Sequence, residues 1–522
     1  MTPARHALRI ALLTAFAAAL LGRLAATTDV MYADGLRYVA GAQAVARGDW
    51  KASVVRAVDH PAYPVAVAAA HGAFGFDDGP QGWQSAAQLA SVVAGAMLVA
   101  PLYLVALELF GPTAAWLAPS LAFLVPSTGH VLADVLSEGL FLLFWTWGCW
   151  AALRFFRQGA ARWLVPTIAC AGLAYLTRPE GLLLPAALAA TLLVSPLSAT
   201  LRLPRAAWLR ATALVVVGPL LVVGPYVALK GGIGTKPAVA RLLGTAPKSS
   251  ATAVERERPL DPGQSALKAF ATSWRGMFRA VQGATTTPLL ALAAFGLWFR
   301  GAPRDAGQLR GRVFVAIVGI AWMLALVRLY ATGGYCTPRH ALILALPLIA
   351  AAGHGLSRLG DRLAVRFAAD APERARLVRG SACLAGLAAI AVGWGARTLA
   401  PINADYAGYR AAGDWLAEHA PADARIFDLK GWAMYYGSRP GYSFADYGEA
   451  AGDPKLGFLV AHDAFLIGEW PYCQTVRDLV GGREPIASFP PSRRKGVAQV
   501  HVFELTPGLA RTEPGPASPT AR

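Results

Sequence analysis

Apolar and polar positions alternate in long blocks over the first 400 residues of the chain. Eleven apolar blocks with few or no charges are separated by connections that carry most of the charge. The approximate bounds of these blocks are 7–22, 84–110, 113–126, 139–153, 163–176, 181–198, 211–229, 285–299, 313–330, 341–357 and 381–398. About 20 apolar residues are needed for a helix to cross a bilayer. The pattern therefore predicts an α-helical polytopic membrane protein with about 11 spans, some of them tilted or broken.

Two connections are long, and the pattern changes near residue 401. The loop 23–83 contains an apolar stretch, 64–75, that is too short to span and is expected to lie along the membrane interface. The second long loop covers 230–284. Beyond 401, β-like runs such as ARIFDL, LGFLVAHDAF and AQVHVFEL occur among turn signals. We expect a transmembrane domain over 1–400, a small extracytoplasmic α/β domain over 401–506 and a disordered tail over 507–522.

Composition and charge agree with a membrane protein. Apolar residues make up 55% of the chain and charged residues only 15%, whereas a soluble domain carries about a quarter. The net charge of +17 does not indicate nucleic-acid binding, because the basic residues cluster between apolar blocks. They concentrate at the N-terminus and in the connections 154–162, 202–210, 300–312 and 358–379. The positive-inside rule makes this set cytoplasmic. The N-terminus is then cytoplasmic, and the two long loops and the tail lie outside the plasma or inner membrane.

The outer connections carry the candidate chemistry, beginning with Asp34. In a helix over 34–47, Asp34, Tyr38 and Ala42 occupy one face, so the carboxylate would face a site with the tyrosine beside it. The alternative is that Asp34 only caps this helix. Asp59-His60-Pro61 opens the interfacial segment. An acid beside a histidine can bind a metal, orient a base or hold a phosphate, or Asp59 can simply cap the next helix.

Two acidic residues, Asp134 and Glu138, are spaced i and i+4 before the fourth block. On one helix both would point into a cavity at the mouth of the bundle, where carboxylates by default mark function. The alternative is a solvated loop that caps the following helix. Arg178-Pro179-Glu180-Gly181 interrupts two apolar blocks, either as part of the site or as a hairpin with an internal ion pair.

Basic residues on the outer side run against the positive-inside trend. Arg339-His340 begins the tenth block there, where a cation can neutralise a phosphate or merely snorkel to the interface. Lys230, Lys236 and Arg241 in the second long loop would bind a lipid-linked phosphate or anionic headgroups in general.

The sequence lacks the motifs that are typical of several other enzyme classes. The sequence contains no P-loop, no HExxH and no GxSxG with a triad, and no internal repeat is visible. The five cysteines show no CxxC spacing. Cys336 and Cys473 would both lie outside, so a disulfide between them is an open alternative. The need for a cofactor is unknown, and a divalent metal is left open.

These motifs together resemble the GT-C membrane glycosyltransferases, in particular the protein-O-mannosyltransferase and aminoarabinose-transferase-like group (glycosyltransferase family 39 and relatives). The family's first outer loop runs D-x3-Y-x3-A-x5-G, matched by Asp34, Tyr38, Ala42 and Gly48, and then a proline turn, matched by His60-Pro61 and Tyr63-Pro64. Asp134 and Glu138 match a second acidic motif. The phrases GLAYLTRPEGLLLP and CTPRHALILALPLI look like two later family stretches. Aminoarabinose transferases have a lysine and paired prolines where this chain has His60-Pro61-Ala62.

The resemblance implies an inverting transferase that moves a hexosyl or pentosyl group from a polyprenyl-phosphate donor on the outer face. The acceptor would be a protein, a lipid or a glycan, and membrane lipids are the other expected partner. Asp34 would be the general base, and Asp134 or Glu138 would position the acceptor or a metal. The remaining candidates fall into donor-phosphate ligands (His60, Arg178, Lys236, Arg241 and Arg339) and substrate-positioning residues (Tyr38, Asp59, Tyr63 and Glu180).

Two other functions remain as alternatives. A transporter or flippase of lipid-linked saccharides would need polar residues at mid-membrane depth and repeat symmetry. A membrane scaffold that binds a partner through its tail would leave the first loop idle, so replacing Asp34 would have no effect.

Overall fold

The computed structural model describes residues 2–233, 265–303, 305–443, 446–450, 452–469, 471–490 and 499–505. Two predicted phosphate ligands, Lys236 and Arg241, lie outside the described residues, as does the tail 507–522 that we expect to be disordered.

Every predicted apolar block contains a helix. The helices are α1 (Pro3–Ala26), α4 (Pro80–Met97), α5 (Val99–Phe110), α6 (Pro112–Leu124), α7 (Pro126–Ala133), α8 (Glu138–Gln158), α9 (Leu164–Thr177), α10 (Leu183–Val194), α11 (Arg205–Lys230), α14 (Thr287–Trp298), α15 (Ala306–Gly333), α16 (Leu342–Ala368) and α17 (Pro372–Thr398). Eight helical segments are long and apolar enough to cross a membrane, and up to ten if each of two bent pairs is one span. The one predicted block outside this set is 163–176, which forms α9 and has only 14 helical residues. The predicted class, an α-helical polytopic membrane protein, is confirmed.

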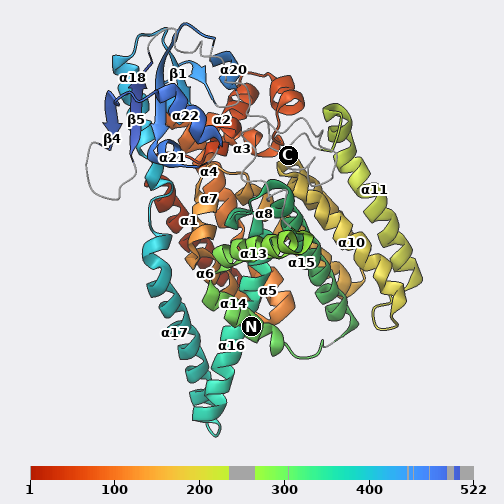
Figure 1. The fold of residues 1–522 in the computed structure, drawn as a ribbon. Coiled ribbons are helices and arrows are strands. Elements are labelled where there is room, and N and C mark those ends of the chain that lie inside the picture. The colour runs from red at the N-terminus through yellow and green to blue at the C-terminus, as the bar shows by residue number, and fades with distance from the viewer. Residues whose placement is uncertain are drawn as a thin grey trace.

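The two bent pairs have local causes. The helices α6 and α7 meet at 74°, where Pro126 opens α7 and prevents the backbone from continuing the α6 hydrogen bonds. The helix α13 (Ala266–Thr285) meets α14 at 95°. Between them Thr286 adopts a φ of 74°, a left-handed conformation that ends the first helix. Consequently α13 runs across the bundle while α14 runs into it (Figure 1).

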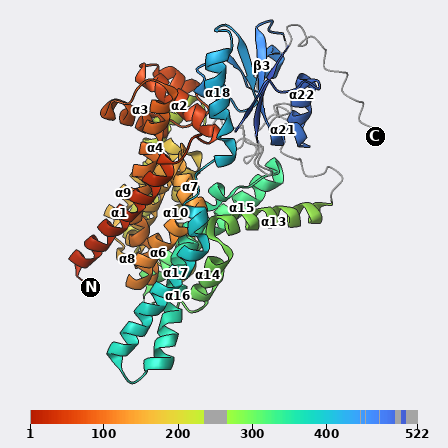
Figure 2. The same cartoon turned by 90° about the vertical axis from the view of Figure 1, so that its left-hand side faces the viewer.

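The connections between helices gather at two ends of the bundle. At one end, Glu108 pairs with Arg154 at 2.8 Å and also with Arg157, and Arg310 donates to the carbonyl of Arg202 at 3.0 Å. These are the basic connections. The candidate acidic and basic residues of the outer set lie at the other end, beside the C-terminal strands. Figure 2 shows the N-terminus and these strands at opposite ends of the molecule.

Short helices cover the candidate end. They comprise α2 (Ala33–Ala46), the π-helical turn η1 (Lys51–Arg56) and α3 (Ala62–Phe74), with the 3-10 turns η3 (Pro179–Leu182), η6 (Pro338–Ala341) and η7 (Ala404–Tyr406). Two other 3-10 turns, η2 (Ala161–Trp163) and η4 (Ser195–Leu197), adjoin the basic connections at the other end. The predicted interfacial segment 64–75 is therefore mostly α3. The helices α2 and α3 pack closely, because a Cβ on Gly41 would lie 3.3 Å from Pro64.

The C-terminal residues form a five-stranded mixed sheet, in the order β2-β1-β3-β5-β4. The strands β2, β1 and β3 are parallel, and β5 is antiparallel to both β3 and β4. The elements are α18 (Gly408–His419), β1 (Arg425–Asp428), α19 (Trp432–Tyr436), β2 (Gly441–Tyr442), α20 (Tyr447–Ala450), β3 (Leu456–His462), α21 (Asp463–Ile467), α22 (Pro471–Val480), β4 (Ala487–Phe489) and β5 (Val500–Glu504). The three predicted β runs are β1, β3 and β5. We call residues 404–505 the sheet region.

Close helix packing in the bundle depends on small residues, as is common in membranes. The helices α14 and α16 touch at Gly296 and Gly355, where a Cβ on Gly355 would lie 2.0 Å from the carbonyl oxygen of Leu292. The cysteines do not link elements. All five are free thiols, so the disulfide considered between Cys336 and Cys473 is not formed.

Candidate active site

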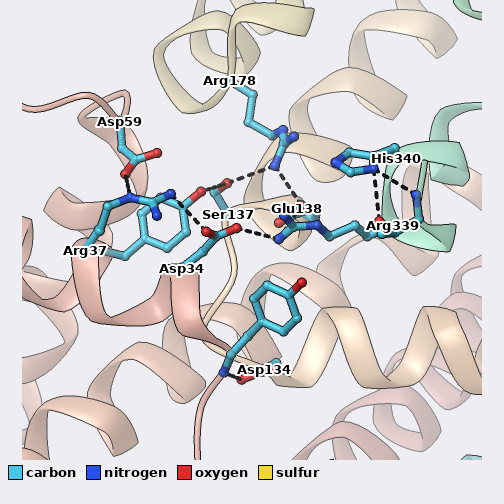
Figure 3. Close-up of polar contacts among 12 residues, drawn as sticks. Asp34, Arg37, Asp59, Asp134, Ser137, Glu138, Arg178, Arg339 and His340 are labelled. Atoms are coloured by element: carbon cyan, nitrogen blue, oxygen red, sulfur yellow. Dashed lines mark hydrogen bonds and ion pairs between the residues drawn. The ribbon is translucent and has the colours of Figure 1, made fainter. Parts of the chain in front are cut away.

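A small cavity at the candidate end joins four separate parts of the chain. Its walls come from the start of α8, the connection between α9 and α10, the middle of α15 and the turn η6 that opens α16. The lining residues are Glu138, Phe141, Leu142, Arg178, Glu180, Trp322, Arg339, His340, Leu342 and Ile343. Its volume is ≈ 10 Å³, room for about one water molecule. Figure 3 shows the charged side chains of Glu138, Arg178 and Arg339 meeting here.

Asp34 lies in the first turn of α2 and contacts Arg339, one of the residues that line this cavity. Its Oδ2 accepts a hydrogen bond from Nη1 of Arg339 at 2.6 Å, and its Oδ1 pairs with Nη2 of Arg37 at 3.0 Å. The N-cap of α2 is Tyr32, not Asp34. The interpretation of Asp34 as a mere cap is therefore wrong, although its charge still complements the positive end of the helix.

Arg37 is a site residue that we did not predict. Its Nε donates to Oδ2 of Asp59 at 3.0 Å, so the guanidinium bridges Asp59 and Asp34. Burial alone would lower the pKa of Arg37, but the charges of Asp34 and Asp59 raise the pKa above its ordinary value. The i, i+3 spacing of Asp34 and Arg37 is the signal that could have identified this residue. Asp59 thus orients Arg37, one turn before α3 begins.

A second ion cluster forms the far wall of the cavity. Arg178 donates to Oε1 of Glu138 at 2.7 Å and to Oε1 of Glu180 at 2.8 Å. Burial opposes the charge of Arg178, yet the two carboxylates raise its pKa well above the usual range. The internal ion pair considered for the Arg178-Pro-Glu-Gly motif is therefore present, and the same two charged side chains line the cavity. The site role of this motif stays a prediction.

Glu138 connects the two clusters. The Glu138 side chain is only 4% exposed, and Nη1 of Arg339 lies 4.0 Å from the oxygen that Arg178 binds. Its other oxygen, Oε2, is buried and has no hydrogen-bond partner among the described residues. The cavity thus presents one free carboxylate acceptor beside two guanidinium groups.

Asp134 does not share the cavity with Glu138, which corrects our prediction. The helix α7 ends at Ala133, and Asp134 has extended backbone angles before a new helix begins at Glu138. The two residues are thus not one turn apart on a single helix. Instead, Asp134 accepts hydrogen bonds from the backbone N–H groups of Tyr32 and Val135, at 3.1 and 2.7 Å. Burial raises the pKa of Asp134 to about 6, against the opposing effect of these hydrogen bonds.

Two predicted positioning residues, Tyr38 and Tyr63, lie beneath the carboxylates. Both are almost fully buried. The hydroxyl of Tyr38 is 2.8 Å from Oγ of Ser137, which Arg178 also approaches at 3.4 Å. The Tyr63 ring packs edge-on against Tyr38, and its hydroxyl is 2.7 Å from Oγ of Ser91. Through Ser137, Tyr38 supports the start of α8 and hence Glu138.

The two histidines occupy different places. His340 lines the cavity, where its Nδ1 lies 2.9 Å from Oγ1 of Thr337. His60 does not line it. His60 is 1% exposed and packs against the rings of Tyr175 and Tyr226, with ring-centre distances of 4.9 and 5.4 Å. Nζ of Lys230 lies 5.9 Å from the centre of the Tyr226 ring.

The charged groups alternate in sign. Around the cavity and α2, four carboxylates (Asp34, Asp59, Glu138 and Glu180) pair with three guanidinium groups (Arg37, Arg178 and Arg339). In the described part of the chain, no group of three or more His, Cys, Asp or Glu residues is arranged to hold a metal ion. The arrangement offers a carboxylate that can accept a proton directly beside cations that can hold an anion.

Comparisons with known proteins agree with this geometry. Residues 81–223 match the family model described as dolichyl-phosphate-mannose-protein mannosyltransferase. No curated protein matches the whole sequence significantly.

Two groups of solved structures share the fold. One is ArnT from Cupriavidus metallidurans bound to undecaprenyl phosphate, with 17% identity, a TM-score of 0.55, and coverage of 97% of this chain and 99% of that one. Another is the archaeal oligosaccharyltransferase AglB from Archaeoglobus fulgidus, in complex with an inhibitory peptide and a dolichol-phosphate. Its identity is 11% and its TM-score 0.55, covering 90% of this chain and 72% of that one.

These findings confirm the resemblance inferred from the motifs. The chain is a multi-pass membrane protein with the GT-C glycosyltransferase fold, and it carries a segment of the mannosyltransferase family model.

Proposed function

We propose that the protein transfers a hexosyl or pentosyl group from a polyprenyl-phosphate donor to an acceptor, with inversion at the anomeric carbon and with Asp34 as the general base. The observation that carries this proposal is the contact of Asp34 with Arg339 at 2.6 Å, in a cavity that Arg178 also lines. One structural neighbour was solved bound to undecaprenyl phosphate, and the other in complex with a dolichol-phosphate and an inhibitory peptide. A lipid-linked phosphate is therefore the donor chemistry that this pair of cations fits.

The reaction needs one group to accept a proton and others to hold the leaving phosphate. The acceptor oxygen attacks the anomeric carbon from the side opposite the phosphate, so the new bond has inverted configuration. Its proton passes to the Asp34 carboxylate. The bond to the phosphate oxygen breaks, and the polyprenyl phosphate leaves with its charge stabilised by Arg339 and Arg178.

The ion pairs suggest an order of binding. Both oxygens of Asp34 are engaged by guanidinium groups, Arg37 at one and Arg339 at the other. A donor phosphate competes with Asp34 for Arg339. When the phosphate takes Arg339, Oδ2 of Asp34 becomes available for the acceptor proton, while Arg37 still orients the carboxylate through Oδ1. Donor binding thereby prepares the base.

The other candidates support this exchange. Glu138 and Glu180 hold Arg178 in place, and Asp59 holds Arg37. Glu138 is also the carboxylate with a free buried oxygen in the cavity wall, so it is the candidate to accept a hydroxyl of the sugar or the acceptor. His60 packs against two tyrosine rings and does not line the cavity, so its role as a donor ligand stays a prediction. Lys236 and Arg241 remain predictions outside the described residues.

The side of the membrane follows from charge. The basic connections lie at the end of the bundle opposite the cavity, so the positive-inside rule puts the cavity, α2, α3 and the sheet region on the extracytoplasmic face. The acceptor is then a protein, lipid or glycan of the cell envelope.

The test uses purified protein in nanodiscs with a panel of radiolabelled polyprenyl-phosphate sugars and envelope acceptors. We compare the wild type with Asp34→Asn and with Asp49→Asn. Asp49 is a matched control because Arg56 is its one side-chain partner among the described residues, in a solvent-exposed ion pair at 3.2 Å. We expect turnover in the wild type and the control, loss of turnover in Asp34→Asn, and a product of inverted configuration. Equal turnover in all three proteins would refute the proposed base. Movement of intact donor across the bilayer without transfer would support a flippase.

A further inference from the structure

A short extended segment, which we call the strap (residues 28–32), links α1 to α2 and leads directly to Asp34. It belongs to no helix or strand, so its backbone polar groups need partners from elsewhere. The central residue, Met31, is fully buried. Its N–H donates to the hydroxyl of Tyr436 at 3.0 Å, and its carbonyl accepts from Nε1 of Trp432 at 2.9 Å. Both side chains come from α19 in the sheet region.

The neighbouring strap residues are held in a similar way. Asn403 precedes the sheet region and has a φ of 55°. Its Nδ2 donates to the carbonyl of Val30 at 3.0 Å and to Oδ2 of Asp134 at 2.9 Å. The other oxygen of Asp134 accepts the N–H of Tyr32, two residues before Asp34. One partly buried amide and one buried carboxylate therefore join the strap, the end of α7 and the entry to the sheet region.

A third anchor comes from α4. Nε2 of Gln84 donates to the carbonyl of Thr28 at 3.1 Å, and its Oε1 accepts from the Tyr436 hydroxyl at 2.7 Å. Gln84 is fully buried. The Tyr436 hydroxyl thus donates to α4 and accepts from the strap at the same time, which ties the sheet region to both.

From these contacts we infer that the sheet region and the residue before it position the general base. Trp432 and Tyr436 of the sheet region, with Asn403 and Asp134, hold the strap and so set the place of Asp34 opposite Arg339. The catalytic role of Asp34 in this inference rests on the proposed function, whereas the anchoring of the strap does not. Asp134 then has a positioning role, in place of contact with the acceptor or a metal.

Asp34 lies so close to the strap that a small movement of the strap reaches its carboxylate. Asp34 is the second residue of α2, and the strap ends where α2 begins. A shift of the strap therefore moves the carboxylate relative to Arg339, which belongs to another element and does not follow. Because misplacement of a reacting group by about 1 Å can cost about a hundredfold in rate, small losses of anchoring are expected to lower turnover before they affect donor binding.

The test compares two adjacent tyrosines whose hydroxyls bind different partners. Tyr436→Phe removes the hydroxyl that binds the strap. Tyr435→Phe is the matched control, because the Tyr435 hydroxyl donates instead to the carbonyl of Pro80 at 2.8 Å. Trp432→Phe is the second strap variant, since it keeps an aromatic ring at this position and loses the indole N–H that binds Met31. The full-length protein in nanodiscs is used throughout.

Hydrogen–deuterium exchange of the peptide that contains Met31 and Tyr32 is the first readout. Loss of one hydrogen bond is expected to speed exchange of the strap by about tenfold in Tyr436→Phe and Trp432→Phe, with wild-type exchange in Tyr435→Phe. Unchanged exchange in both strap variants, or the same increase in Tyr435→Phe, would overturn the inference. This readout needs no turnover, so it also judges the holding of the strap if the proposed function fails.

Steady-state kinetics is the second readout. The strap variants are expected to lose about tenfold in kcat at an unchanged KM for the donor, because Arg339 and Arg178 keep their positions. An increase in KM alone, with kcat unchanged, would overturn the positioning role. Absence of turnover in the wild type with every donor would instead count against the proposed function.

Discussion

Replacing Arg178 by methionine tests the energetics of the cavity most sharply. The change keeps most of the side-chain volume and removes the guanidinium that binds Glu138 at 2.7 Å and Glu180 at 2.8 Å. Glu138 cannot rotate into water, because its side chain is only 4% exposed, whereas Glu180 is 20% exposed. The variant therefore leaves one carboxylate charged and buried with Arg339 as its nearest cation, at 4.0 Å.

The expected loss follows from these distances. Breaking a buried ion pair by removing one partner costs about 3–5 kcal/mol. The remaining attraction of Arg339 reduces the penalty on Glu138, and the more exposed Glu180 adds less than about 1 kcal/mol. We expect Arg178→Met to lose about 3 kcal/mol of stability. The double variant Arg178→Met with Glu138→Gln removes the uncompensated charge and should recover most of that loss.

In the assay, both variants and the wild type are heated in the same detergent, and intrinsic tryptophan fluorescence reports their unfolding. The single variant should melt several degrees below the wild type, and the double variant close to it. Donor turnover should stay low in both, because both lack a cation for the leaving phosphate. A single variant as stable as the wild type, or a double variant no more stable than the single, would refute the reasoning.

Three further outcomes are expected. Burial raises the pKa of Asp134 from 3.8 to about 6. Its contribution to stability is therefore full below pH 3.8 and is lost as the pH rises through 6, a change of about 3 kcal/mol. The melting temperature of Asp134→Asn should lack this pH dependence, and pH profiles that run parallel in the variant and the wild type would contradict it. Gly355→Ala should lower the melting temperature, because its Cβ would lie 2.0 Å from the Leu292 carbonyl, whereas Gly393→Ala, with nothing within 4 Å, should not. Arg339→Lys keeps the charge but loses the planar guanidinium, so donor affinity should fall about tenfold; wild-type affinity would indicate that Arg339 does not contact the phosphate.

The membrane-spanning part of the fold could be predicted from the sequence because long apolar blocks have few alternatives. Each of the blocks became a helix, including the short α9. The bends at Pro126 and Thr286 were not placed, because a proline or a left-handed residue ends a helix without revealing the direction of the next one. In the sheet region, β2 and β4 were missed since they have only two and three residues.

The candidate site was predicted as a set of separate residues, not as contacts. Asp34 and Arg339 are 305 positions apart, and no local pattern indicates that they form an ion pair. The placement of Asp134 and Glu138 on one helix was wrong because spacing alone ignored a helix start. Ser137 before Glu138, at the head of an apolar run, is the N-terminal signal that would have divided the segment.

The strap could not be predicted because its partners lie far away in the sequence. Tyr436 follows Met31 by 405 positions, and Trp432 by 401. The sequence alone therefore predicts an independent C-terminal domain, whereas the structure connects this region to the loop that carries Asp34. Buried backbone groups in irregular segments need such partners, but which side chains supply them depends on the folded arrangement.

The central claim is that Asp34 takes the proton of the acceptor while Arg339 holds the donor phosphate. Equilibrium binding of a fluorescent polyprenyl phosphate, measured beside donor turnover in Asp34→Asn and Arg339→Met, tests it most directly. We predict that Asp34→Asn binds the lipid phosphate at least as tightly as the wild type and does not turn over the donor, since removal of the carboxylate charge frees Arg339. We predict that Arg339→Met loses at least about tenfold in affinity. Undiminished turnover in Asp34→Asn, or undiminished binding in Arg339→Met, would contradict the account.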